Sequence, residues 1–412
     1  MERHSNLILT KLYIPRPRAN LVPRLRLVDR LEEGQQGKVT LISAPPGFGK
    51  TTLLSDWARR GERPVAWLTL DERDNDLTRF LTYLIAALQT AYEEMGQIAW
   101  EMLLTQGQPA YESILTALLN ECAGTATDMA AGTASGAAAE PGQPLVLILD
   151  DYQLITARPV HEAVTFLLDF MPPQMHLVIA SRTDPELSLG RLRISGQLTE
   201  LRATDLRFTE AEIAMFFQGV ADLGLSAGDI ASLLANTEGW AAGLQVAALS
   251  MKGRDDVSGF IQSFSGSNRY ILDYLIEEVL ARQPEAIQRF LTQTAILERL
   301  SGSLCDAVLA GGVEEQGSGG AEGHGDGGAE GQMASGEGQA VLEWLEAANL
   351  FVVPLDDKRH WYRYHPLFAE FLRSYLATTR PGLYHWGVMG LVPSICHYSR
   401  VPGSSNYSAK KH

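Results

Sequence analysis

Short segments that are apolar throughout alternate with amphipathic segments across the first half of the chain. The amphipathic segments repeat their apolar residues with the period of a helix. Strands that are apolar at every position are buried on both faces, and their alternation with helices is typical of a parallel sheet covered on both sides. The expected strands are 38–44, 64–70, 144–152 and 175–182, and the expected helices are 51–60, 77–95 and 160–171. The predicted fold class is therefore α/β.

The pattern changes after this region. Residues 209–300 have helical periodicity only, and 268–297 reads as one long amphipathic helix that Pro284 interrupts. Residues 339–376 follow the order helix, strand, turn, strand, helix, which predicts a small winged-helix unit.

Three stretches lack such patterns. Residues 123–144 are rich in Ala, Gly and Thr, and residues 311–340 are rich in Gly. Neither offers enough apolar surface to offset the entropy of ordering, so both are predicted to be flexible insertions in surface loops. The tail 379–412 mixes Gly, Pro, Ser and aromatic residues without a period and is predicted to be irregular.

Composition narrows the function classes. The 412 residues carry 34 basic and 49 acidic side chains, a net charge of −15, so no direct nucleic acid binding is expected. The three scattered cysteines form no CxxC pair, which indicates neither a disulfide framework nor a zinc site. Without a signal-peptide pattern or a membrane-length apolar run, the expected location is the cytoplasm and no membrane partner is expected.

The segment 44–52, APPGFGKTT, follows the first predicted strand and leads into a predicted helix. It fits the pattern [G/A]-x-x-x-x-G-K-[S/T] of a phosphate-binding P-loop, with Ala44 in place of the usual first glycine. Glycines allow backbone N–H groups to face an anion, the lysine reaches phosphate oxygens, and the threonine hydroxyl binds Mg²⁺. The alternative is an ordinary Gly/Pro-rich turn. The predicted nucleotide-binding residues are Ala44, Pro45, Pro46, Gly47, Phe48, Gly49, Lys50, Thr51 and Thr52.

Two further strand ends carry candidate catalytic groups. Asp150 and Asp151 end the apolar run 144–152, and we expect this strand to lie beside the P-loop strand. Asp150 would then bind Mg²⁺ together with Thr51, and Asp151 would polarise the attacking water. Arg182 ends the next strand, where a cation senses or neutralises the γ-phosphate. The alternatives are a strand-capping DD pair and a surface arginine.

Taken in order, these motifs resemble those of MalT-type, LuxR-family, ATP-dependent transcriptional regulators, a group of the signal-transducing ATPases with numerous domains (STAND). The resemblance extends over about residues 10–376. The stretches that carry it are TKLYIPRPRANLVPRLRLVDRL, SAPPGFGKTTLLSDW, VAWLTLDERDND, LILDDYQLI, ASRTDPELSLGRLRISGQLTELRATDLRFTEAE, TEGWAAGLQVAAL and YRYHPLFAEFLR.

The resemblance implies a P-loop NTPase sheet with helices on both faces, followed by a helical domain and a winged-helix domain. It also implies that Val22, Pro23 and Arg24 contact the adenine and that His365 contacts the ADP phosphate; the alternative for His365 is a packed histidine at a helix start. Trp240 is expected to pack in the core rather than touch nucleotide. The implied domains are an N-terminal nucleotide-contacting segment (1–36), the ATPase domain (37–207), the helical domain (208–300), the winged-helix domain (301–378) and the irregular tail (379–412).

The resemblance therefore implies an ATP/ADP-binding switch with slow ATPase activity, Mg²⁺ as cofactor and self-association in the ATP state. Family members continue into a helical-repeat sensor and a helix-turn-helix domain, and neither pattern occurs in these 412 residues. Two alternatives stay open: a truncated interaction module that binds nucleotide without hydrolysis, and a free-standing P-loop ATPase. A small-molecule kinase is a third option, which the helical and winged-helix regions disfavour.

Overall fold

The computed structural model describes residues 7–16, 21–61, 64–104, 110–130, 145–220, 223–311 and 337–379. The contacts divide the chain into two compact units. One comprises Met1–Gln262 with Ala347–Asn349, and the other Ser263–Glu346 with Leu350–His412.

The first unit is built on a five-stranded parallel sheet in the order β2-β3-β4-β1-β5. This confirms the predicted α/β class. The strands are β1 (Val39–Ser43), β2 (Val65–Thr69), β3 (Leu145–Asp150), β4 (Met175–Ser181) and β5 (Leu198–Arg202). The edge strand β5 is missing from the sequence prediction, because LTELR is half polar and only partly buried and so does not read as a core strand.

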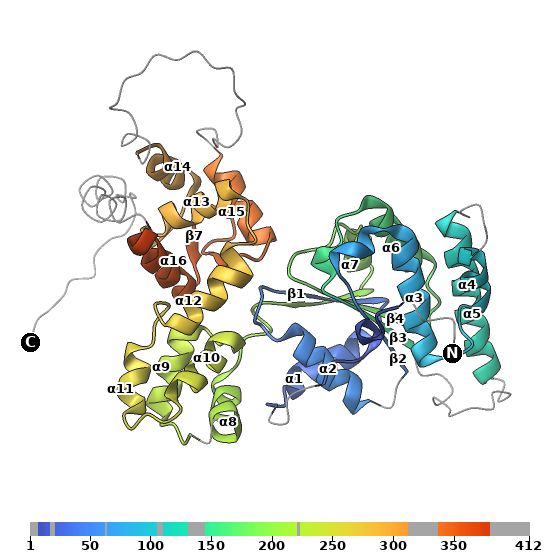
Figure 1. The fold of residues 1–412 in the computed structure, drawn as a ribbon, viewed down its shortest axis with the longest axis horizontal. Coiled ribbons are helices and arrows are strands. Elements are labelled where there is room, and N and C mark those ends of the chain that lie inside the picture. Colours follow the sequence, from blue (N-terminus) through green and yellow to red (C-terminus); the bar gives the residue numbers. More distant parts are fainter. Residues whose placement is uncertain are drawn as a thin grey trace, which may run out of the picture. The chain divides into compact units, whose positions relative to one another are not determined.

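Helices cover both faces of this sheet (Figure 1). One face packs on α1 (Leu25–Gly34) and α2 (Lys50–Arg60), and the other on α3 (Leu77–Ala91) and α6 (Arg158–Phe170). Successive strand side chains point to opposite faces. Thus Leu41 and Leu147 join the core under α3 and α6. A further pair, α4 (Gln97–Leu104) and α5 (Tyr111–Ala130), packs beside α3 and α6.

Helix α5 corrects one prediction. The stretch predicted as a flexible insertion begins at residue 123, but the helix continues to Ala130. The residues at issue, 123–130, include three alanines, which have the highest helix propensity, and no proline, so low apolarity alone does not end the helix there. The rest of that stretch, 131–144, lies outside the described residues.

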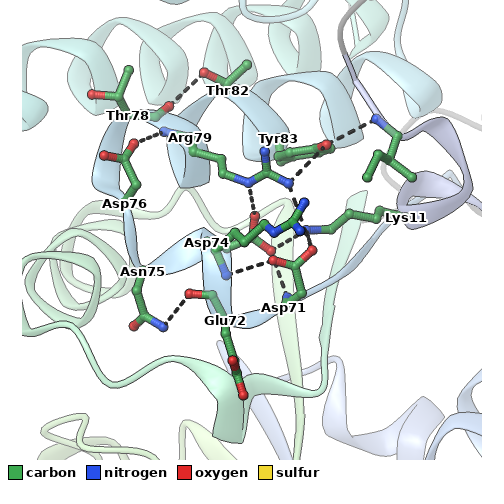
Figure 2. Close-up of polar contacts among 12 residues, drawn as sticks. Lys11, Asp71, Glu72, Asp74, Asn75, Asp76, Thr78, Arg79, Thr82 and Tyr83 are labelled. Carbon is green, nitrogen blue, oxygen red and sulfur yellow. Dashed lines mark hydrogen bonds and ion pairs between the residues drawn. The ribbon is translucent and has the colours of Figure 1, made fainter.

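The N-terminal segment is tied to the sheet by a buried charge cluster (Figure 2). Lys11, in the short helix η2 (Leu9–Leu12), donates hydrogen bonds to the carboxylates of Asp71 and Asp74, and its ammonium lies 4.4 Å from the centre of the Tyr83 ring. Arg79 approaches the same ring and bonds Asp74 at 3.1 Å. Asp74 is completely buried, and the ion pairs with Lys11 and Arg79 offset the cost of burying its carboxylate.

The remainder of the first unit is helical beyond β5, as predicted for the region from residue 209. A short helix α7 (Gly190–Ile194) precedes β5. The helices that follow are α8 (Glu210–Val220), α9 (Ala227–Thr237), α10 (Ala241–Met251) and α11 (Val257–Ser263).

The second unit shows the predicted order of helix, strand, turn, strand, helix. Its elements are α12 (Arg269–Leu275), the π-helical turn η5 (Ile276–Leu280), α13 (Glu285–Thr294), α14 (Gly302–Gly311), α15 (Gly338–Ala347), β6 (Val352–Pro354), β7 (Tyr362–Tyr364) and α16 (Pro366–Thr379). Strands β6 and β7 pair antiparallel. The helix predicted over 268–297 is indeed interrupted at Pro284, which immediately precedes α13.

Two sequence predictions fall on residues that the structure does not describe. Most of the Gly-rich stretch, 312–336, and the tail from residue 380 lie outside the described ranges. Within the described ranges, no helix has the length and apolarity needed to cross a membrane.

Candidate nucleotide-binding site

The predicted P-loop connects buried strand β1 to helix α2. Gly47 and Gly49 have φ of 79° and 80°, in the left-handed region that glycine adopts at no steric cost. A Cβ added to Gly49 would meet nothing within 4 Å, so its backbone conformation, rather than lack of room, is what favours glycine there. Pro45 and Pro46 are buried and carry no N–H, and the Phe48 side chain is 3% exposed. The loop therefore offers backbone amides from Gly47 onward as anion donors.

Lys50 begins α2 and turns back over the loop. Its Nζ donates to the carbonyl oxygens of Ala44 at 2.6 Å and Pro45 at 3.1 Å. The side chain is buried, and this burial, reinforced by the nearby charge of Arg182, lowers the pKa of Lys50 to about 8. Asp151 and Asp150 act in the opposite direction. A cation that is only weakly solvated is thus held where phosphate oxygens would attract it.

Thr51, in the first turn of α2, meets Asp150, the last residue of β3. The Thr51 hydroxyl donates to Asp150, with Oγ1 2.9 Å from Oδ2 and 3.2 Å from Oδ1. The expectation that the Asp150 strand lies beside the P-loop strand is wrong, because β4 lies between β1 and β3. Sequence order could not reveal this insertion. The two side chains nevertheless meet, because all three parallel strands end at the same rim. Thr52, the next residue of the motif, is exposed on α2.

The Thr51–Asp150 pair fits a magnesium ion by its chemistry. Both groups supply oxygen, and Mg²⁺ is typically held by one or two carboxylates together with phosphate oxygens and water. Burial, and then the charge of Asp151, raises the pKa of Asp150 to about 6. A cation at this position would relieve that unfavourable burial of charge. The described ranges contain no cluster of three or more His, Cys, Asp or Glu side chains that could hold a metal without such added ligands.

Asp151 and the end of β4 are joined by a residue that sequence reasoning missed. Nε2 of Gln153 donates to Oδ1 of Asp151 at 2.9 Å, and its Oε1 accepts the Arg182 backbone N–H at 2.9 Å. Asp151 itself has φ of 59°, a left-handed conformation that is unusual outside glycine. The only sequence signal for Gln153 is its position two residues after the carboxylate pair. The structure thus gathers Lys50, Thr51, Asp150, Asp151 and the Arg182 backbone at one rim.

The predicted adenine-side residues have different environments. Val22 is buried and Pro23 is exposed. Arg24 is 7% exposed, and its Nη2 donates to the carbonyl oxygens of Leu206 and Arg207, both at 2.8 Å. Burial lowers the pKa of Arg24 to about 10. The Arg24 guanidinium is therefore engaged with protein groups, and adenine contact by these three residues stays a prediction.

His365 lies in the second unit, directly before α16. It is 2% exposed, its backbone N–H donates to the Phe351 carbonyl at 2.8 Å, and its ring lies edge-on to the Phe351 ring. These contacts place it as a packed residue at a helix start. Its contact with an ADP phosphate stays a prediction.

Trp240 packs in the core of the first unit as expected, since its side chain is 1% exposed. Its indole N–H also donates to the carbonyl oxygen of Pro46 at 3.1 Å. The sequence contains no local signal for this contact, because 194 residues separate its partners.

Two parts of the chain match known domain families. Residues 18–179 match the AAA ATPase domain, and residues 276–384 match the MalT winged helix domain. A solved Walker-type ATPase of Pyrococcus abyssi covers 87% of this chain and 98% of its own, with a TM-score of 0.55 at 17% identity. That likeness supports the P-loop ATPase fold alone.

Curated relatives extend over nearly the whole chain. The HTH-type transcriptional regulator MalT of Klebsiella pneumoniae is 31% identical over 410 residues, covering 97% of this chain and 41% of the regulator. MalT of Yersinia pestis is 33% identical over 408 residues, covering 96% and 41%. The chain thus spans about two fifths of the length of these regulators. The chain thus contains a match to an AAA ATPase domain in its first half and to a MalT winged helix domain in its second, and over nearly its whole length it is similar to part of the MalT regulators.

Proposed function

We propose that this chain is the regulatory core of a MalT-like transcriptional regulator, a switch that binds ADP or ATP and resets by slow hydrolysis. Two lines of support carry the proposal. One is the relation to the MalT regulators. The other, and the single strongest observation, is the convergence of Lys50, Thr51 and Asp150 around the amides of a glycine-rich loop.

Nucleotide binding would use groups that now bond one another. Lys50 would exchange the carbonyl oxygens of Ala44 and Pro45 for phosphate oxygens, which compensate its charge better than neutral carbonyls do. The amides from Gly47 onward and the N-terminus of α2 would hold the remaining phosphate charge. Thr51 and Asp150 would hold Mg²⁺, which when bound neutralises charge on the phosphates.

Hydrolysis would use the neighbouring rim. The Asp151 carboxylate, oriented by Gln153, would accept a hydrogen bond from water and align it. Arg182, whose charge already affects Lys50, would neutralise charge that develops as the γ-phosphate leaves. In this proposal, Asp151 determines the rate of turnover and contributes little to binding.

The switch would depend on different affinities of two conformations for ADP and ATP, since a ligand that binds both states equally shifts nothing. ADP would stabilise a resting form of the chain. ATP would stabilise a form that self-associates.

Sedimentation and turnover measurements on the purified chain test this proposal. Sedimentation velocity with Mg²⁺ and either ADP or ATPγS should show a larger species with ATPγS only. Phosphate release from ATP should be slow, and Asp151→Asn should slow it at least about tenfold while ADP affinity is kept. Asp169→Asn, at an exposed position on α6, is the matched control.

The outcomes separate the alternatives. A chain that binds both nucleotides without measurable turnover would be the non-hydrolysing interaction module. Fast turnover with no change of oligomeric state would favour the free-standing ATPase.

A further inference from the structure

Helix α10 contacts the P-loop through two hydrogen bonds that use donors of different kinds. The Trp240 indole Nε1 donates to the Pro46 carbonyl oxygen at 3.1 Å. The backbone N–H of Ala242, in the first turn of α10, donates to the Gly47 carbonyl oxygen at 3.0 Å. Trp240 is the N-cap residue of this helix and is 1% exposed, so its bond to Pro46 is shielded from water.

These two hydrogen bonds fix the orientation of the backbone amides that would bind phosphate. A peptide unit is planar, and its C=O and N–H point in opposite directions. The Pro46 carbonyl shares a peptide unit with the Gly47 N–H, and the Gly47 carbonyl shares one with the Phe48 N–H. Holding both carbonyl oxygens toward α10 therefore turns both N–H groups away from α10. In a loop with two left-handed glycines, which is conformationally permissive, such a constraint prevents the amides from rotating out of position.

The turn just before Trp240 lies close against the backbone of Phe208. Gly239 has φ of 72°, and a Cβ there would lie 2.5 Å from the Phe208 carbonyl oxygen. The Phe208 N–H donates to the Gly239 carbonyl at 2.9 Å. Next to it, Glu238 also has a positive φ and forms an ion pair with Arg207 at 2.7 Å. A backbone hydrogen bond and an ion pair thus hold this turn against residues 207–208.

Arg24 also contacts these two residues. Its guanidinium lies 4.4 Å from the centre of the Phe208 ring, in addition to its hydrogen bonds to Leu206 and Arg207. A continuous series of contacts therefore runs from the segment predicted to lie at the adenine, through Phe208 and Gly239, to Trp240 and the P-loop.

We propose that Trp240 is a positioning residue for nucleotide binding, which pre-orients the Gly47 and Phe48 amides for phosphate through its bond to Pro46. The proposal rests on the proposed nucleotide-binding function and deepens it. Linkage is reciprocal, so bound phosphate would in turn strengthen the contact between α10 and the loop.

A pair of tryptophan variants tests the proposal. Trp240→Phe keeps most of the aromatic packing and removes the N–H donor. Trp67→Phe is the matched control, because Trp67 is also fully buried and donates one hydrogen bond, from Nε1 to the Thr69 hydroxyl at 2.9 Å on β2. Thermal unfolding of both variants compares their losses of stability, and calorimetric titration with Mg²⁺ and ADP measures affinity.

The expected result is a Kd about tenfold higher for Trp240→Phe and unchanged for Trp67→Phe. Wild-type affinity in Trp240→Phe, or equal weakening in both variants, would overturn the proposal. A wild-type chain that binds no ADP would instead contradict the proposed function, and this inference with it.

If Trp240→Phe does not fold, amide hydrogen exchange measured on the wild-type chain tests the proposal instead. Adding Mg²⁺ and ADP should slow exchange of the Ala242 amide and leave that of mid-helix amides of α6 unchanged. An unchanged rate at Ala242 in a chain that binds ADP would overturn the proposal.

Discussion

The Thr51 hydroxyl donates to Asp150 at 2.9 Å, although the strand that carries Asp150 is separated from the P-loop strand by β4. The contact brings together one group from the helix after the P-loop and one from the end of a distant strand. Both supply oxygen at the rim where the loop amides lie. This arrangement is the basis of the magnesium and phosphate assignments.

The first prediction concerns the Thr51 hydroxyl. Thr51→Val should remove a magnesium ligand, so Mg²⁺ should no longer improve ADP affinity, and the Kd with Mg²⁺ should rise about tenfold. Titrations with Mg²⁺ and with EDTA provide the measurement. Thr51→Ser keeps the hydroxyl and should behave as wild type. Full magnesium dependence in Thr51→Val would remove Thr51 from the site.

The second prediction concerns proton exchange on binding. The pKa of Lys50 is lowered to about 8, so near pH 8 about half of the free chain lacks this charge, and phosphate favours the charged form. Binding of ADP with Mg²⁺ should therefore take up protons at pH 8, and affinity should fall as pH rises further. The pKa of Asp150 is raised to about 6, and Mg²⁺ favours its charged form, so binding should release protons near pH 6.

Calorimetry in buffers of different ionisation enthalpy measures both effects. Lys50→Ala should lose the uptake at pH 8, and Asp150→Asn should lose the release at pH 6, which separates them from ionisation of the nucleotide itself. Proton exchange of the same sign at both pH values in the wild-type chain would contradict this assignment.

The third prediction concerns Gln153. Gln153→Glu can still accept the Arg182 N–H but can no longer donate to Asp151, and it places a second negative charge beside that carboxylate. Turnover of ATP should fall about tenfold with little change in ADP affinity. Gln174→Glu, exposed before the opposite end of β4, is the control. Equal turnover in both variants would exclude an orienting role for Gln153.

The fourth prediction concerns the buried cluster of Figure 2. Lys11→Met leaves the fully buried Asp74 with Arg79 as its remaining ion-pair partner and should lower the free energy of unfolding by about 3 kcal/mol. Adding Asp74→Asn should recover part of this loss, because it removes the buried charge that Lys11 no longer helps to compensate. Denaturant unfolding provides the measurement, with the exposed Lys252→Met as control. A loss below about 0.5 kcal/mol would show that the cluster contributes little.

Local patterns predicted much of this architecture. Four apolar strands, the glycine-rich loop and the break at Pro284 are each encoded in a few neighbouring residues. Strand β5 was not predictable because its half-polar sequence reflects an edge position, and helix α5 extends past the point where composition suggested an end.

Contacts between residues far apart in the sequence could not be predicted from these local patterns. Insertion of β4 between β1 and β3, the bridge made by Gln153 and the bond from Trp240 to Pro46 all depend on where the chain returns in space. A period along the sequence carries no information on such contacts. They are also the contacts that would orient the proposed phosphate-binding and water-aligning groups. The sequence thus indicated which residues form the candidate site, but not the contacts that hold them in place.

The account depends most directly on phosphate recognition by the loop that contains Lys50. Calorimetric titration of the wild-type chain, Lys50→Ala and the exposed control Lys252→Ala with ADP and with ATPγS, each with Mg²⁺, tests this claim. The account predicts saturable binding by wild type and control and at least about a hundredfold weaker binding by Lys50→Ala, since a desolvated charge-assisted contact is lost. Equal affinity of Lys50→Ala and wild type for both nucleotides would contradict it.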